Sequence, residues 1–336
     1  IQTIAAQGPV SVATDAGGFY EATGLAPGTY RVEEIEQPDG YLDGLDAAGT
    51  VNGESRGSAV NPGDSIETIF LGGGQAGIDY DFGELMPVSI EGRVLITNPY
   101  GDCYGADVTE RAFEGATVRL LDNSGNVIDE TLTNADGTYR FDGLFPGIYS
   151  IVEVTPAGLI DGEDHVGTVG GSPVGAITAN DTIAGIALTS GQGGIAYDFC
   201  EHRPASVSGH VYHDHDNDGR REAGEEGIGS VRVALIDSGG NEIGSTTTDQ
   251  RGFYEFNGLS AGVYTIVETH PDGWVDGLDR AGTIDGTTVG NAVNPGDRIR
   301  AVDLRWGDQG VDYDFGELRY AVIQGSVVLT TPEGDC

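Results

Sequence analysis

Apolar and polar side chains alternate over short stretches of this chain, and no segment shows a 3.6-residue apolar stripe. Val231, Val233 and Leu235 alternate with Arg232 and Ala234, for example, and a period of two is typical of a strand with one buried face. Gly-rich clusters such as residues 237–241 separate these stretches and predict turns. Within residues 203–318 the pattern predicts seven short strands, at 206–212, 230–236, 244–248, 252–256, 263–269, 299–305 and 311–315. Strands of this length and spacing predict an all-β fold, an Ig-like antiparallel β-sandwich.

The tripeptide Tyr-Asp-Phe recurs along the chain at nearly constant spacing. It begins at Tyr80, Tyr197 and Tyr313, so the steps are 117 and 116 residues. Self-similarity at a fixed period is the signature of a tandem array of one domain type. We therefore expect β-sandwich repeats with these bounds: repeat one at 1–85 without its front, repeat two at 86–202, repeat three at 203–318, and the start of a fourth at 319–336.

Alternate repeats resemble each other more closely than neighbours do. Asn-Pro-Gly-Asp at 61–64 recurs at 294–297, and Gly-Asp-Cys at 101–103 recurs at 334–336, in both cases 233 residues later. The unit of the array is therefore predicted to be a pair, type A (repeats one and three) and type B (repeats two and four). Because the sequence begins inside one repeat and stops near the start of another, we expect a window from a longer protein, with any export signal or anchor outside it.

The chain carries 54 acidic residues against 16 basic residues, all of them Arg, for a formal charge of −38. Such a surface repels nucleic acid and anionic lipid and attracts divalent cations. No apolar run approaches the ~18 residues that a membrane-spanning helix needs. Composition thus argues against nucleic-acid partners and against a membrane span in this segment, and it favours binding of metal ions.

Residues 214–225 carry the clearest chemical motif, D-x-D-x-D-G with an acid at position 12. Ca²⁺ takes about six to eight oxygen ligands, which a loop coiled around the ion supplies. Gly219 permits the sharp turn that this coiling needs. The expected ligands are the side chains of Asp214, Asp216 and Asp218, the backbone carbonyl of Arg220, Glu222 directly or through water, and both oxygens of Glu225.

Two other interpretations of this loop stay open. It could be a solvated acidic hairpin without an ion. Alternatively, His210, His213 and His215 could hold a transition metal, because imidazole suits zinc and copper. The number of oxygen ligands favours calcium over both.

A second acidic pattern, Asp-Gly-x-Asp, occurs once in each repeat. Two carboxylates three residues apart in a turn could share a calcium ion, or they could cap the backbone of the turn. The candidate residues are Asp43 and Asp46, Asp161 and Asp164, and Asp276 and Asp279.

Type B repeats lack the calcium-type loop and carry cysteines instead. Cys103 lies in the equivalent loop, and Cys200 replaces the Gly that follows Tyr-Asp-Phe in type A. We therefore expect a disulfide between Cys103 and Cys200, which implies an oxidising compartment. Closing a loop of about 97 residues would add roughly 4–5 kcal/mol in the chain-entropy model. The alternatives are three free thiols or a bridge from Cys200 to Cys336.

These residues resemble those of a known family. The loop at 214–225, Thr-Asp-Gln-Arg-Gly-Phe-Tyr at 248–254, Gly-Leu at 258–259 and Gly-Val-Tyr at 262–264 are similar to the SD-repeat B-type (SdrD B-like) domains of bacterial surface proteins, relatives of the collagen-adhesin B-type domains. The resemblance covers every complete repeat and is strongest in repeat three. It implies a prealbumin-like β-sandwich, calcium that stiffens a stalk, and an extracellular location on the cell surface.

Some relatives form an internal Lys–Asn isopeptide bond beside a catalytic Glu. Glu34, Glu153 and Glu268 stand at the matching strand, but the chain contains no Lys. The bond therefore cannot form, and we interpret the three glutamates as structural.

We expect no enzyme. Residues 72–77 match G-x-G-x-x-G, but a strand pattern and no helix pattern follows, so a phosphate site is not expected there.

Two functional hypotheses follow. In the first, the chain is a structural segment of a giant extracellular repeat protein, a surface fibre or stalk stiffened by calcium and disulfides, whose partners are neighbouring repeats and other copies. In the second, it is an adhesin whose repeats bind a glycan or a partner protein through an aromatic such as Trp274 or Tyr41, unless that ring packs against the domain edge. Strand donation between molecules, from 319–336 into repeat one, ranks below simple truncation because the loose strand is type B and the open body is type A.

Overall fold

The computed structural model describes residues 2–5, 8–103 and 111–328. Regular structure in this part of the chain is entirely β-strand, and none of it is a helix long and apolar enough to cross a membrane. The chain divides into two compact units, the first made of Ile1–Val94, Ala112–Val154 and Asp164–Phe199, the second of Leu95–Arg111, Thr155–Glu163 and Cys200–Cys336. This division does not follow the repeat boundaries, which stay a prediction.

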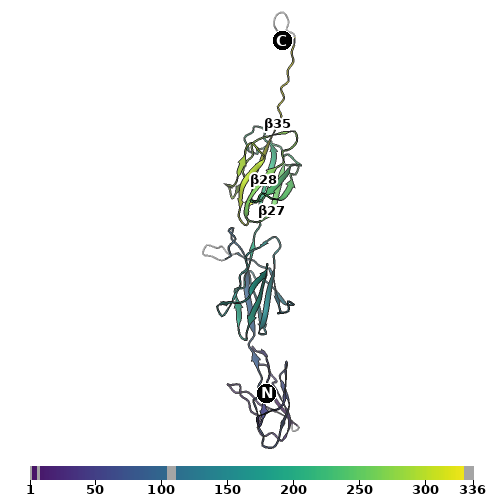
Figure 1. Ribbon diagram of the computed structural model, residues 1–336, viewed down its shortest axis with the longest axis vertical. Coiled ribbons are helices and arrows are strands. Elements are labelled where there is room, and N and C mark those ends of the chain that lie inside the picture. Colours follow the sequence, from purple (N-terminus) through teal and green to yellow (C-terminus); the bar gives the residue numbers. More distant parts are fainter. Residues whose placement is uncertain (1, 6–7, 104–110, 329–336) are drawn as a thin grey trace. The chain divides into compact units, whose positions relative to one another are not determined.

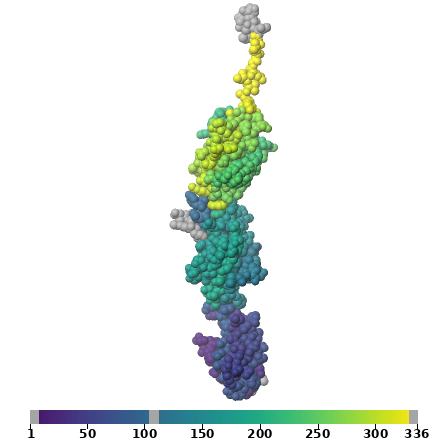
Figure 2. Space-filling view, in the orientation of Figure 1, coloured from purple at the N-terminus to yellow at the C-terminus, as the bar shows by residue number. Residues whose placement is uncertain are grey.

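Repeat three lies wholly in the second unit and is a sandwich of two sheets (Figure 1). The first sheet has the order β27 (Phe253–Leu259), β24 (Ala205–His213), β35 (Phe315–Arg319) and β29 (Trp274–Asp276), with β34 (Gln309–Gly310) also beside β24. The second has the order β26 (Glu242–Thr247), β25 (Arg232–Ile236), β28 (Gly262–Glu268), β33 (Arg298–Leu304) and β32 (Asn291–Val293). A short hairpin pairs β30 (Thr283–Ile284) with β31 (Thr287–Thr288). In Figure 2 the residues of this sandwich, coloured green to yellow-green, form one compact body.

The core of repeat three lies between the two sheets. Val233, Leu235 and Ile266 enter it from the second sheet, and Val207 and Phe315 enter it from the first. The predicted buried face of residues 231, 233 and 235 is confirmed, because all three side chains are buried, but Ala234 on the opposite face is buried as well, so the predicted alternation is wrong at that position. Alternation along the strands therefore supplies one apolar layer from each sheet, and burial of these layers is the main force that stabilises the sandwich.

One predicted strand, 311–315, is wrong. The chain leaves the sheet after Gly310, since Asp312 has a φ of 61°, a left-handed conformation that breaks a strand. Pairing resumes at Phe315, where β35 runs parallel to β24 with His213 opposite Glu317. The sandwich is therefore antiparallel except where β24 meets β34 and β35.

Glycine in the middle of the first strand allows a close backbone approach. A Cβ on Gly209 in β24 would lie 1.8 Å from the carbonyl oxygen of Tyr313. In repeat two, a Cβ on Gly92 would lie 1.7 Å from the carbonyl oxygen of Tyr197. No side chain fits at either position, so each strand can meet its Tyr-Asp-Phe segment only through glycine.

Repeats one and two each contain a five-stranded sheet with the strand order of the second sheet of repeat three. In repeat one the order is β2 (Gly8–Ser11), β1 (Gln2–Ala5), β3 (Gly28–Glu33), β8 (Ser65–Leu71) and β7 (Ser58–Val60). In repeat two it is β14 (Val127–Leu132), β13 (Thr117–Leu121), β16 (Gly147–Val154), β21 (Thr182–Leu188) and β20 (Ala176–Ala179). The common order supports the prediction that the chain copies one domain type.

Shorter pairings complete these two repeats. In repeat one, β4 (Leu42–Asp43) pairs with β10 (Glu84–Leu85), and β5 (Thr50–Val51) pairs with β6 (Glu54–Ser55) and β9 (Gly77–Ile78). In repeat two, β11 (Val88–Ile96) pairs with β15 (Thr138–Leu144) and β22 (Gly193–Ile195). The strand β18 (Thr168–Val169) pairs with β19 (Ser172–Pro173) and with β22. The strand β17 (Ile160–Asp161) pairs with β23 (Phe199–His202). The remaining strand is β12 (Arg111–Ala112).

Candidate metal centres

The calcium-type loop begins where β24 ends. Asp214 is fully buried, and its carboxylate accepts hydrogen bonds from the backbone N–H groups of Asn217 at 2.6 Å, Asp218 at 3.3 Å and Gly219 at 2.8 Å. Gly219 has a φ of +74°, as a sharp turn at this position requires. The loop therefore coils around its first acid, as the motif predicts.

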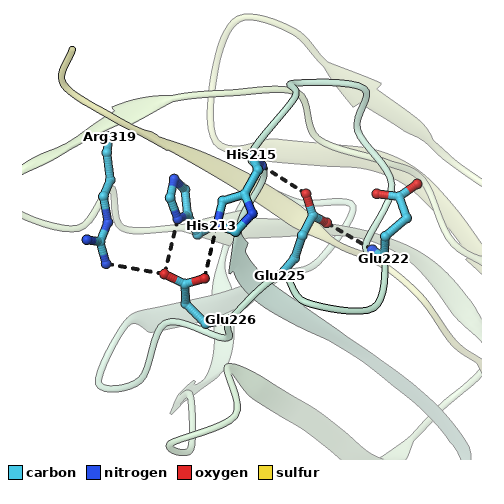
Figure 3. A network of polar contacts seen from close by, with 6 residues as sticks. All are labelled: His213, His215, Glu222, Glu225, Glu226 and Arg319. Carbon is cyan, nitrogen blue, oxygen red and sulfur yellow. Dashed lines mark hydrogen bonds and ion pairs between the residues drawn. The ribbon is translucent and has the colours of Figure 1, made fainter.

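The last acid of the motif closes the loop. Glu225 accepts hydrogen bonds from the N–H of His215 through Oε1, at 2.8 Å, and from the N–H of Glu222 through Oε2, at 2.9 Å (Figure 3). Asp216, Asp218 and Glu222 are exposed to solvent. The pKa of Glu222 is raised, by desolvation first and then by the negative charges of Asp218, Glu225 and Asp216.

These residues fit a hard cation. The loop offers carboxylate oxygens crowded closely enough to raise the pKa of one of them, and Ca²⁺ is bound by oxygen ligands of this kind. The calcium ligands predicted from the motif therefore stay a prediction. The local geometry of the loop is compatible with it.

A different group lies beside this loop, made of two histidines and one glutamate (Figure 3). Glu226 contacts Nδ1 of His213 at 3.2 Å, Nε2 of His215 at 3.1 Å and the guanidinium of Arg319 at 3.3 Å. His210 pairs instead with Asp314, Nδ1 to Oδ1 at 3.6 Å. The structure thus brings together two of the three predicted histidines, and the Arg319 charge on their shared carboxylate disfavours a metal ion there.

The Asp-Gly-x-Asp pair of repeat three belongs to a larger group. Asp276 and Asp279 lie with Glu268, Asp297 and Glu317, and we name these five residues the carboxylate cluster. Burial raises the pKa of Glu268 and of Asp279, and the negative charges of neighbouring cluster members raise both pKa values further. His270 is the basic neighbour, with Nδ1 3.4 Å from Oε2 of Glu317 and 3.6 Å from Oδ1 of Asp297.

Three members of the cluster are deeply buried. Glu268 is 3% exposed, Asp279 5% and Glu317 0%. Burial, and then the neighbouring Glu317, raise the pKa of Glu268 to about 10. Burial, and then Asp276, raise the pKa of Asp279 to about 8, and burial raises the pKa of Glu317 to about 7 against the lowering effect of His270. Without a counter-ion, these carboxyl groups hold protons well above their ordinary pH range.

The Asp-Gly-x-Asp acids also contribute to turn structure. In repeat one, Oδ2 of Asp43 accepts a hydrogen bond from the N–H of Gly63 at 3.0 Å, while its Oδ1 is buried without a hydrogen-bond donor. In repeat two, Oδ2 of Asp164 accepts from the N–H of Asp181 at 3.1 Å. One aspartate side chain can therefore cap the turn with one oxygen and still offer its other oxygen to a cation.

Sequence reasoning identified Asp276 and Asp279 but missed the other three members. It interpreted Glu268 as structural and gave Asp297 and Glu317 no role. A signal for both was present, because Asp297 ends the recurring Asn-Pro-Gly-Asp and Glu317 follows the recurring Tyr-Asp-Phe-Gly.

The predicted disulfide joins Cys103 to Cys200, with the two Cα atoms 6.3 Å apart. Both cysteines are buried against Leu95, within the second unit. The bridge fastens the loop after β11 to β23, as the cysteine pattern predicts. Cys336 lies outside the described residues.

The aromatic residues considered for adhesion differ in their surroundings. Trp274 is half-buried against the core, with the Arg319 guanidinium 5.0 Å from the centre of its ring and the His213 ring at 5.1 Å. Tyr41 is 40% exposed. Trp274 therefore packs against the domain edge, which was the alternative interpretation of this ring.

The fold and these sites define a class, tandem prealbumin-like β-sandwich domains of surface proteins. The chain belongs to the SdrD B-like domain family, whose model matches residues 104–200 and 205–317, and a prealbumin-like fold domain model (SpaA) matches residues 3–56. The expected family and fold are thereby confirmed, and they place the segment outside the cell, on its surface.

The relatives are long surface proteins. Serine-aspartate repeat-containing protein F of Staphylococcus epidermidis is 32% identical over 283 residues, 81% of this chain and 16% of the relative. Serine-aspartate repeat-containing protein E of Staphylococcus aureus is 31% identical over 265 residues, 78% of this chain and 22% of the relative. The chain thus spans less than a quarter of either. Among solved structures, the Bacillus anthracis TIE protein matches with a TM-score of 0.35 and 17% identity, over 94% of this chain and 46% of that one.

Proposed function

We propose that this chain is a stalk segment of an extracellular surface protein, stiffened by Ca²⁺ at the loop of type A repeats and by a disulfide in type B repeats. Family membership supports the coarser statement, a stalk or adhesin segment. The stiffening proposal rests on a comparison of the two loops.

The loop of each repeat type starts from the same place. In repeat three, the N–H of Asp214 donates to the carbonyl oxygen of Glu317 at 3.0 Å. In repeat two, the N–H of Thr97 donates to the carbonyl oxygen of Glu201 at 2.9 Å. Both loops therefore leave the sheet beside the strand that follows Tyr-Asp-Phe.

The calcium-type loop and the disulfide differ at one residue position beside the loop. This difference is the observation that carries the proposal. Cys200 precedes Glu201 in type B, and Gly316 precedes Glu317 in type A. A Cβ on Gly316 would lie 2.7 Å from the carbonyl oxygen of Leu278 and 3.3 Å from both the Cβ and Oδ2 of Asp214. The space beside this strand can thus hold either a cysteine side chain or the first carboxylate of the loop. Each repeat type therefore has one kind of cross-link at this place, a disulfide or a calcium-binding loop.

Both fastenings suit a strongly acidic chain of small domains. Bound Ca²⁺ offsets part of the repulsion within a formal charge of −38. Small sandwiches with modest apolar cores also gain stability from covalent or metal cross-links. The partners in this proposal are neighbouring repeats and other copies of the chain.

Scanning calorimetry of the whole chain tests the proposal. Chelator is expected to lower the melting temperature of the transitions that belong to type A repeats, because calcium binds only their folded state. Reductant is expected to lower the melting temperature of repeat two, by the equivalent of at most roughly 4–5 kcal/mol, because it opens the long loop that the disulfide closes. Melting curves that neither treatment changes would overturn it.

An adhesin is the second candidate, with less support. Tyr41 is exposed, but Trp274 is covered by Arg319 and His213. Binding on a glycan array that disappears with Tyr41→Ala would favour this candidate over the stalk.

A further inference from the structure

The loop that carries Cys103 in repeat two contacts a turn of repeat three. We name residues 97–103 the disulfide loop and residues 305–308, between β33 and β34, the entry turn. The backbone N–H of Trp306 donates to the carbonyl oxygen of Pro99 at 3.1 Å. Nη1 of Arg305 donates to the hydroxyl oxygen of Tyr100 at 3.0 Å, and the guanidinium lies 4.6 Å from the centre of the tyrosine ring. Both segments belong to the second compact unit.

The ring of Trp306 lies flat on the ring of His202. Their centres are 3.9 Å apart and their planes differ by 5°. His202 ends β23 and is 8% exposed. Gly101 faces the edge of the indole, where a Cβ would lie 3.2 Å from Nε1 of Trp306, closer than nearly all real Cβ contacts. The indole therefore occupies a space formed by His202, Gly101 and the backbone of Pro99.

The disulfide holds the two sides of this space together. Cys103 ends the disulfide loop and is bonded to Cys200, which lies in β23 two residues before His202. At the start of the loop, Oγ1 of Thr97 lies 2.7 Å from Nδ1 of His202. The loop is thus fastened at both ends to the strand that carries the stacked imidazole.

The linker between repeats two and three is short. β23 ends at His202 and β24 begins at Ala205, so Arg203 and Pro204 alone connect them. Proline fixes its own φ and keeps the residue before it extended. A Cβ on Gly307 of the entry turn would lie 3.5 Å from the Cβ of Arg203, so the turn runs beside the linker. A linker this short holds the two surfaces at a high effective concentration, and contacts of modest individual strength therefore stay formed.

The entry turn has an equivalent in each repeat, with different residues at its tip. In all three, the N–H of the first residue donates to the side chain of the fourth. The pairs are Arg305 and Asp308 at 2.8 Å, Thr189 and Gln192 at 2.8 Å, and Gly72 and Gln75 at 2.7 Å. The first two positions are Arg-Trp in repeat three, Thr-Ser in repeat two and Gly-Gly in repeat one. The aromatic tip thus occurs in the repeat that follows the disulfide loop.

From these contacts we infer that the disulfide loop is a docking site for the entry turn of the next repeat, and that the Cys103–Cys200 bridge holds this site in shape. The partner that fits is a turn presenting an Arg-Trp pair. The stack on His202 carries most of the contact, since Tyr100 remains 68% exposed. Docking restricts motion at the linker. The inference rests on the proposed function in that it extends stiffening by the disulfide from repeat two to the junction with repeat three.

Acrylamide quenching of Trp306 fluorescence in the whole chain tests the docking. Trp274→Phe, made in every protein compared, leaves Trp306 as the single tryptophan. His202→Ala removes the ring under the indole, and the quenching constant is expected to rise toward that of the chain unfolded in urea. His165→Ala is the matched control, because His165 is an exposed histidine of repeat two outside the disulfide loop, and it is expected to leave the constant unchanged. A folded His202→Ala chain that is quenched no more than the parent overturns the docking site.

The same measurement tests the role of the bridge. Cys103→Ser/Cys200→Ser is expected to raise the quenching constant as His202→Ala does, because the loop is no longer fastened to β23. If that variant does not fold, as judged by circular dichroism, Cys103→Ala/Cys200→Ala decides, since it places no hydroxyl group in the buried site. A folded chain without the bridge in which Trp306 stays as protected as in the parent overturns the role assigned to the disulfide.

A third variant separates this inference from the proposed function. Arg305→Thr/Trp306→Ser gives repeat three the tip found in repeat two and leaves the bridge intact. Hydrogen exchange of the amide at position 306 is expected to lose its protection, and an amide as protected as in the parent overturns the docking. The shift in the melting temperature of repeat two on adding reductant is expected to persist. Absence of that shift in the parent chain would contradict the proposed function, whereas the quenching and exchange results decide the docking.

Discussion

The hydroxyl of Tyr254 donates a 2.6 Å hydrogen bond to the carbonyl oxygen of Tyr313, and both residues are buried. Tyr139 makes the same bond to Tyr197 in repeat two, also at 2.6 Å. This contact holds the Tyr-Asp-Phe segment against the sheet, and its repetition explains why that tripeptide is the clearest sequence signature of the array.

Tyr254→Phe is expected to destabilise repeat three by about 1–3 kcal/mol, because it leaves the buried carbonyl of Tyr313 without a donor. Urea unfolding measures the change. Tyr320→Phe is the control, since Tyr320 is 69% exposed, and it should leave the unfolding midpoint where it was. Equal midpoints for the two variants would contradict the assigned importance of the hydrogen bond.

Gly209→Ala is expected to destabilise repeat three by at least about 3 kcal/mol, because the new Cβ would meet the Tyr313 carbonyl oxygen at 1.8 Å. The same substitution at Gly325, where a Cβ would meet nothing within 4 Å, serves as the control. Thermal unfolding of both variants checks this, and a Gly209→Ala protein as stable as the parent would show that the strands can separate without cost.

Asp216→Asn separates the loop's calcium chemistry from its folding. Asp214 and Glu225 accept backbone hydrogen bonds, whereas the exposed Asp216 makes no hydrogen bond in the described structure. The variant should weaken Ca²⁺ binding at the loop by about tenfold or more, because it removes a charged ligand. Its melting temperature in chelator should equal that of the parent. A lowered melting temperature in chelator would give Asp216 a structural role that needs no ion.

In chelator, the stability of repeat three should fall as the pH rises from about 5 to about 8. The folded-state pKa values of Glu317, Asp279 and Glu268, about 7, about 8 and about 10, lie above the ordinary values of 4.5 for Glu and 3.8 for Asp. Between the two ranges the folded state binds more protons than the unfolded state, so the stabilisation is complete at low pH and is lost as pH rises through the folded values.

The groups that face these carboxyls are Asp276, Asp297 and His270. The pKa of His270 is also raised, which adds to the trend in the same direction. Urea unfolding over this pH range measures the slope, and Glu268→Gln/Glu317→Gln should flatten it. A parent chain whose stability rises over the range would contradict the buried, uncompensated state of the cluster.

Sequence reasoning worked where the information is local. Alternation located the strands of residues 231–235, the motif spacing located the loop around Asp214, and the paired appearance of Cys103 and Cys200 in one repeat type located the disulfide. It failed where the backbone changes direction without a turn signal, as at Asp312.

The carboxylate cluster could not be predicted from the sequence, for a different reason. Glu268 and Glu317 are 49 residues apart in the sequence, and only the packing of one sheet on the other brings their side chains together. An acid at the end of a strand is usually solvated, so nothing local marks Glu268 as buried. Recurrence of Asp297 and Glu317 could have marked them for attention but not for a common site.

The parallel pairing of β24 with β35 has a mechanical consequence. These strands carry the chain into and out of repeat three, and their parallel direction puts the entry and the exit at opposite ends of the pair. Tension along the chain therefore pulls the two strands past each other, and it loads the bonds that join Val211–His213 to Phe315–Glu317 in shear, all at the same time. A domain loaded in this way resists pulling until the whole ladder ruptures, whereas one loaded at a single end would open bond by bond.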